Sequence, residues 1–233
     1  MRPVHRILAI LFLGSLLCGF AAQPSPETCV MECVLRKMDD AAANFHTTQA
    51  DFVWDQYQKV VDETDTQKGT VYYRRSGKEI EMMAEIKEPD AKFVLYREGK
   101  LQVYQPKIEQ VLVYPTSSHG DIESYLVLGF GGSGQELTKS FDVSYTGDET
   151  VAGIATGKLQ LIPKSEKVRN NFFAKAILWI DLSRGISVQQ QFFQIQGDYR
   201  LARYSGVRIN AKIGNDVFQL KTTKKTQFVS PRG

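Results

Sequence analysis

The glycines between Gly129 and Gly134 are spaced as in a phosphate-binding loop. The stretch Gly129-Phe-Gly-Gly-Ser-Gly134 spells GxGxxG, a pattern that binds a dinucleotide pyrophosphate when it joins a strand to a full crossover helix. Gln135 to Ser140 leaves too little chain for that helix, and the flanking segments alternate like antiparallel strands. We therefore expect a flexible hinge here and no dinucleotide cofactor.

Cys29 and Cys33 are the two thiols that could form a redox or disulfide site. On one helix their i, i+4 spacing places both on the same face. A disulfide between consecutive turns of a helix has poor geometry and closes almost no chain. CxxxC is also not the CxxC of thioredoxin-like proteins, so we expect two thiols near a loose terminus or an intermolecular bridge.

Candidate catalytic and metal-binding residues are few. Beyond the N-terminal leader the histidines are His46 and His119, and no His, Cys, Asp and Glu cluster has the spacing of a metal site. Nothing points to a Ser-His-acid triad. The sequence therefore predicts a protein that is not an enzyme and needs no metal or cofactor.

Arg74 and Arg75 end a strand-like run that begins after Gly69. With a period of two, Arg75 shares the face of Val71 and Tyr73. An arginine on an otherwise apolar face is costly unless it is paired or hydrogen-bonded. The residues alone leave two interpretations: Arg75 has a role on that face, or the strand has ended and Arg75 is exposed.

The elements that position these residues are one helix and a long series of strands. Ser25-Pro26-Glu27 is a helix start, and the predicted helix continues to about residue 44. Its apolar stripe consists of Val34, Met38, Ala41 and Phe45. From Ala50 on, the period is two; for example, Ile80, Met82, Ala84 and Ile86 share one face, opposite Glu79, Glu81 and Glu85.

Further strand-like runs cover most of the remaining chain. They are 92–97, 101–105, 109–114, 141–146, 157–162, 175–181, 186–195, 198–209 and 216–222. Short turns and the absence of a βαβ rhythm predict one antiparallel sheet, which must curl or close at this length. Residues 121–140 break the alternation, so we expect short helices or a flap inserted between strands.

The composition is that of a globular chain. The 233 residues carry 29 Lys and Arg against 26 Asp and Glu, a formal net charge of +3, and 42% are hydrophobic. These values exclude a disordered chain, a coiled coil and a multi-span membrane protein. The charge is too balanced to predict nucleic-acid binding.

Residues 1–21 have the organisation of a signal peptide. A basic start with Arg2 and Arg6 precedes an apolar stretch from Ile7 to Leu17, which is shorter than the ~20 residues that span a bilayer. We predict cleavage after Ala21, export, and one mature domain over residues 22–233.

The order of these segments resembles the periplasmic lipoprotein carrier family, LolA. The stretches that carry the resemblance are Gly69-Thr-Val-Tyr-Tyr-Arg-Arg75, Phe93-Val-Leu-Tyr-Arg-Glu-Gly-Lys100, Val103-Tyr-Gln-Pro106, Glu109-Gln-Val111, Leu159-Gln-Leu-Ile-Pro-Lys164 and Ile177-Leu-Trp-Ile-Asp181. The resemblance extends over most of the mature chain. It departs from the family pattern after Arg75, where Ser76 replaces the usual proline.

This resemblance implies a mainly β fold, an unclosed antiparallel β-barrel or half-barrel of about 10 to 11 strands, with an N-terminal helix and an inserted helical lid. Its apolar concave face would hold acyl chains, with Met82 and Met83 as adaptable lining. Arg75 would hydrogen-bond the lid and keep it shut over an empty cavity. The expected ligand-binding residues are Arg75, Val71, Tyr73, Met82, Tyr125, Leu126, Leu128 and Phe130.

The function implied by the resemblance is that of a monomeric periplasmic chaperone carrying lipoproteins from the inner to the outer membrane. The expected partners are acylated lipoproteins, an inner-membrane lipoprotein-releasing ABC transporter and an outer-membrane acceptor, with no nucleic acid. One alternative is a related lipid-binding or envelope-stress-sensing module on the same fold. That module would be membrane-anchored if Cys18 is acylated, although Leu17 is not the small residue that lipoprotein signals place before that cysteine.

Overall fold

The structure is a computed structural model that describes residues 30–77, 79–115 and 128–230. Its strands are β1 Thr47–Gln58, β2 Glu63–Ser76, β3 Glu79–Glu88, β4 Lys92–Arg97, β5 Lys100–Gln105, β6 Gln110–Pro115, β7 Phe141–Val151, β8 Ile154–Pro163, β9 Lys175–Asp181, β10 Ser187–Phe193, β11 Tyr199–Ile209 and β12 Gln227–Val229. Its helices are α1 Met31–Ala43, α3 Gly134–Ser140 and α4 Glu166–Asn171, with 3₁₀ turns η1 Pro106–Ile108 and η2 Asn215–Phe218.

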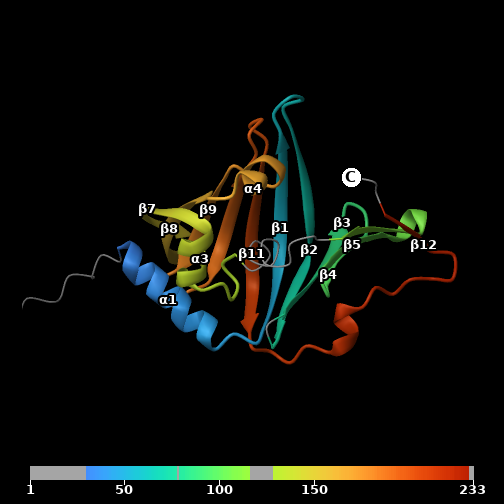
Figure 1. Cartoon of the computed structure of the whole chain (residues 1–233), viewed down its shortest axis with the longest axis horizontal. Helices are drawn as coiled ribbons and strands as arrows, with labels where there is room; N and C mark the ends of the chain where they lie inside the picture. The colour runs from blue at the N-terminus through green and yellow to red at the C-terminus, as the bar shows by residue number, and fades with distance from the viewer. Residues whose placement is uncertain (1–29, 78, 116–127, 231–233) are drawn as a thin grey trace, which may run out of the picture.

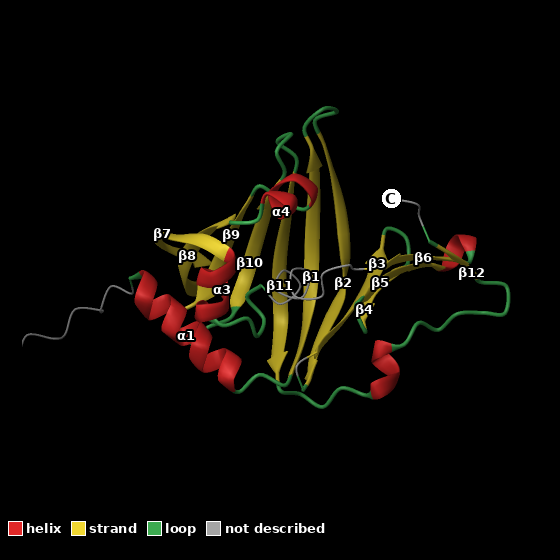
Figure 2. Ribbon diagram, in the orientation of Figure 1, coloured by secondary structure: helices red, strands yellow, loops and turns green. Residues whose placement is uncertain are grey.

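These strands form one sheet that does not close on itself. The order is β12-β6-β5-β4-β3-β2-β1-β11-β10-β9-β8-β7, so β12 and β7 are its two ends. The strand pairs are antiparallel except for β12, which pairs with β6 in parallel. The predicted half-barrel is confirmed, with 12 strands where about 10 to 11 were expected. Figure 1 shows its long central strands, and Figure 2 shows α1 and α3 at one end of the sheet.

The two faces of the sheet carry different apolar sets. Ala50, Val71 and Ala84 lie directly opposite one another on β1, β2 and β3, and all three are buried. Because direct partners in antiparallel strands share a face, these residues define the face that we call the inner face. The opposite, outer face carries Tyr72 and Met83.

Helix α1 covers the inner face at the β7–β9 end. Val34 and Met38 are buried against Leu159, Leu161 and Leu178. The predicted apolar stripe is confirmed except at its third position, where the buried residue is Ala42 and Ala41 is only partly buried. The described helix begins at Met31, and the predicted start at Ser25–Glu27 lies outside the described residues.

Cys33 is disulfide-bonded. The expectation of a free or intermolecular thiol is therefore wrong, and the partner lies outside the described residues because the chain's other cysteines are Cys18 and Cys29.

The C-terminal segment is not the predicted strand. Residues 216–222 form the 3₁₀ turn η2 and an irregular stretch that includes exposed Lys221, and the final strand is the short β12. The ring of Phe218 is fully buried against Met83 and Leu95 on the outer face. Met83 therefore faces away from Met82, and its expected place in a ligand cavity is wrong. None of the helices described is long and apolar enough to cross a membrane.

Candidate binding cavity

A cavity of about 390 Å³ lies on the inner face of the sheet. Its floor is formed by Val71 and Tyr73 of β2 and by Met82 and Ala84 of β3. These four side chains come from alternate positions of two neighbouring strands, so the period of two brings them to one face. All four side chains are hydrophobic, so the floor of the cavity is mainly apolar.

The cavity walls come from segments far apart in the chain. Val94 of β4 and Leu101 of β5 line one side. Phe172 and Phe173, which follow α4, line the cavity together with Phe192 of β10. The volume lies within the roughly 300–1,000 Å³ of small-molecule sites, and apolar walls with a few polar groups are typical of them.

The segment 128–140, which we call the lid, packs on the inner face beside this cavity. Phe130 is fully buried, stacked at 5.5 Å on the ring of Tyr73 and edge-on at 4.6 Å to the ring of Tyr204. The backbone carbonyl of Gly129 accepts a hydrogen bond from the Ser187 N–H at 2.8 Å. The lid is thus attached to the strands that build the cavity.

Arg75 contacts the lid directly. Its Nη2 donates a hydrogen bond to the carbonyl oxygen of Gly131 at 2.8 Å, and its guanidinium lies 5.4 Å from the centroid of the Phe45 ring. Gly131 has a φ of +102°, and a Cβ there would lie 2.5 Å from the Phe45 ring. Only glycine combines that backbone conformation with so close an approach, which explains one glycine of the GxGxxG pattern without a nucleotide.

Buried hydroxyl and amide groups join the cavity to the lid. The Tyr204 hydroxyl donates to Gln190 Oε1 at 3.1 Å, and Gln190 Nε2 donates to the carbonyl oxygen of Leu128. Burial raises the pKa of Tyr204 to about 12 and raises the pKa of Tyr73 well above its usual value. Both phenols therefore stay neutral at physiological pH, which keeps this part of the cavity uncharged.

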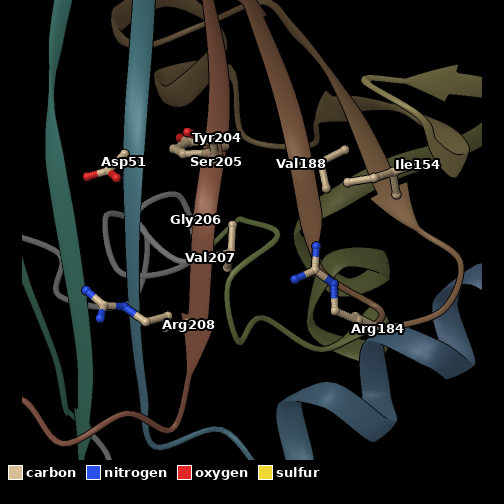
Figure 3. Close-up of a pocket in the computed structure, with 9 residues that line it drawn as sticks. All are labelled: Asp51, Ile154, Arg184, Val188, Tyr204, Ser205, Gly206, Val207 and Arg208. Carbon is tan, nitrogen blue, oxygen red and sulfur yellow. The ribbon is translucent and has the colours of Figure 1, made fainter.

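A second hollow of about 580 Å³ opens between β11 and the start of β10. Figure 3 shows Asp51, Arg184 and Arg208 among its lining side chains. It forms because the pairing of β11 with β10 ends at Arg203 and Gln189, while β11 continues to Ile209. This hollow is more open and more polar, so the inner-face cavity is the better candidate for an apolar ligand.

Comparison with known proteins gives likenesses of fold. No protein-family model and no curated protein sequence matches the chain. A crystal structure of MucB matches with a TM-score of 0.50 and 13% identity, over 81% of this chain and 62% of that chain. The chain has the fold of MucB. It spans 62%, or less than two thirds, of the MucB chain that it matches.

Two other structures are similar to the chain. An uncharacterized conserved protein from Thermus thermophilus matches with a TM-score of 0.55 and 12% identity, over 86% of this chain and 98% of that one. A LolA superfamily protein from Nitrosomonas europaea matches with a TM-score of 0.42 and 15% identity, over 83% of this chain and 98% of that one.

The structure brings most of the expected site residues together. Val71, Tyr73 and Met82 line the cavity. Leu128 and Phe130 belong to the lid beside it, and Arg75 is hydrogen-bonded to that lid. Tyr125 and Leu126 lie outside the described residues. No group of three or more potential metal-binding side chains occurs in the described part of the chain.

Sequence reasoning missed the cavity residues of β1, β10 and β11. They include Trp54, Gln190, Phe192, Arg200 and Tyr204. A usable signal was present, because Arg200 shares a strand face with Ala202 and Tyr204, just as Arg75 shares one with Val71 and Tyr73. The missing information was the pairing of β1 with β11, which joins segments about 150 residues apart.

Proposed function

We propose that this chain binds the acyl chains of lipids or lipoproteins in its inner-face cavity, and that it carries lipoproteins across the periplasm. The observation that carries the proposal is an apolar cavity on the inner face of an open sheet, next to a lid hydrogen-bonded to Arg75. Each acyl CH₂ removed from water contributes about 0.8 kcal/mol. An acylated protein therefore needs such a cavity to cross an aqueous compartment.

The lid contacts support reversible binding. Arg75 and Gln190 attach the lid through its backbone carbonyls, and Phe130 packs on two tyrosines beside the cavity. A few hydrogen bonds of this kind, each worth about 0.5–3 kcal/mol, hold a closed state that a bound acyl chain can displace. A carrier requires this balance because it must release its cargo.

The wider role follows from the sequence resemblance. In this proposal residues 1–21 direct export and the mature domain works as a monomer. An inner-membrane lipoprotein-releasing ABC transporter supplies the cargo, and an outer-membrane acceptor receives it. No catalytic step is assigned to the protein.

A second candidate is a lipid-binding or envelope-stress-sensing module on the same fold, which the MucB match fits equally well. The two candidates differ in their cargo. Mass spectrometry of what co-purifies with the protein from the periplasm separates them. A triacylated protein supports the carrier, whereas free lipid supports the second candidate.

The cavity itself is tested by filling it. Leu101→Trp adds an indole to the cavity wall, and we expect at least a tenfold loss of affinity, about 1.4 kcal/mol, for a neutral acyl ligand. Equilibrium dialysis with tritiated methyl dodecanoate measures this. Ile108→Trp is the matched control, because Ile108 is 59% exposed in the turn that follows β5. Equal affinity in both variants would place the ligand elsewhere.

A further inference from the structure

Arg200 lies on the inner face at the polar end of the cavity. In the strand register it is opposite Gln56 of β1 on one side and Phe192 of β10 on the other. All three residues line the cavity together with Asp198 and Gln194. The cavity therefore has an apolar floor of β2 and β3 residues and an opening where a cation meets neutral amides.

Two aromatic rings hold the Arg200 guanidinium in place. Its Cζ lies 5.2 Å from the centroid of the Trp54 ring and 5.2 Å from that of the Phe192 ring. Both rings are themselves part of the cavity wall. Cation–π contacts of this kind hold a guanidinium near aromatic rings without pairing its charge with a carboxylate.

Those N–H groups have no acceptor among the described residues. Within residues 30–77, 79–115 and 128–230, no carboxylate lies within 4.0 Å of the Arg200 guanidinium, and it donates no hydrogen bond. Arg203, three residues further along β11, shows the contrast because it is paired with Asp55. Arg200 is a positioned cation whose donors remain available to a ligand.

The neighbouring carboxylate of Asp198 is hydrogen-bonded elsewhere and is not paired with Arg200. Asp198 Oδ1 accepts a hydrogen bond from the backbone N–H of Lys59 at 2.9 Å. The Lys59 side chain also packs against Gly197, since a Cβ on that glycine would lie 2.7 Å from its Cδ. Asp198 thus accepts a backbone hydrogen bond from Lys59 and forms no ion pair with Arg200 in the described part of the chain.

We propose that Arg200 is an anion-binding residue, and that the cavity prefers an amphiphile whose acyl chain ends in a carboxylate or a phosphate. The chain would occupy the apolar floor and walls, and the anionic group would accept hydrogen bonds from the guanidinium. Planar, forked donors suit both of these anions. This inference rests on the proposed acyl-chain function and adds the charge of the preferred ligand.

The test compares ligands that differ only at the head. Equilibrium dialysis with tritiated dodecanoate, dodecyl phosphate and methyl dodecanoate is expected to show about tenfold tighter binding of at least one anion than of the ester, the range of one charge-assisted hydrogen bond. In Arg200→Gln the ratio of anion affinity to ester affinity is expected to fall to about one. Whichever anion shows the preference identifies the head group.

Arg208→Gln is the matched control. Arg208 lies on the same strand but lines the hollow between β10 and β11, so this variant removes the same charge and should keep the anion preference. Equal binding of the anions and the ester by the unaltered protein, or an undiminished preference in Arg200→Gln, would overturn the proposal. Failure of the proposed function is a different result, namely no binding of any of the three ligands.

Discussion

Replacing Arg75 with Leu is expected to release the lid from the sheet and raise its open population about 10- to 100-fold, the range of a hydrogen bond from a charged group. The variant loses the Nη2 bond to the Gly131 carbonyl and the guanidinium above the Phe45 ring. Native-state amide hydrogen exchange over residues 128–140 measures the effect, because local opening exposes those amides without global unfolding. In a transfer assay, the weaker closed state should also impair release of cargo to an acceptor.

A second variant reaches the same contact from the lid. Gly131→Ala forces a side chain into a φ of +102° and against the Phe45 ring, so it should increase exchange in the same residues while leaving Arg75 intact. Because both changes act on one contact, the double variant should open the lid by less than the product of the two single effects. Slow exchange over the lid in Arg75→Leu, or normal handover of lipoproteins by it, would show that Arg75 does not control closure.

Local periodicity is enough to predict the faces of the strands. The period of two places Ile80, Met82, Ala84 and Ile86 on one face of β3, and all four are buried in the inner-face core. Such a pattern depends only on the geometry of one extended strand. The same alternation places Arg75 beside Tyr73, and the structure shows it in contact with the lid.

Features that depend on long-range packing are not predictable in the same way. Phe218 and Leu220 alternate like strand residues, but Phe218 is buried because η2 packs it onto the outer face against Met83 and Leu95. The cavity walls likewise require β10 and β11 to close onto β1, a pairing that no local pattern specifies. The floor of the candidate site could therefore be predicted from the sequence. Its walls could not, and alternation along β11 alone did not show that Arg200 lies at the same cavity, because that depends on the pairing of β1 with β11.

Loss of the buried carboxylate of Glu81 should destabilise the fold, because it joins two arginines. Its side chain is only 8% exposed and lies between two arginines, with Oε2 at 2.5 Å from Arg74 Nη2 and Oε1 at 3.1 Å from Arg97 Nε. Arg74 also donates to Asn215 Oδ1 at 2.6 Å and lies 4.3 Å from the centroid of the Phe218 ring. This cluster therefore connects the sheet to the C-terminal segment.

Glu81→Ala is expected to lower the free energy of unfolding by about 2 kcal/mol, the range for removing a hydrogen-bond partner of a charged group, because the two arginines left behind are partly solvated. Urea unfolding measures it, and exchange of the amides near η2 should rise first, since Arg74 loses the carboxylate that orients it toward Asn215. Glu79→Ala is the control on the same strand, because Glu79 is exposed and makes no ion pair with the described residues; its effect should stay within about 0.5 kcal/mol. Equal stability of the two variants would mean that burial of Phe218, and not the charge cluster, holds the C-terminal segment to the outer face.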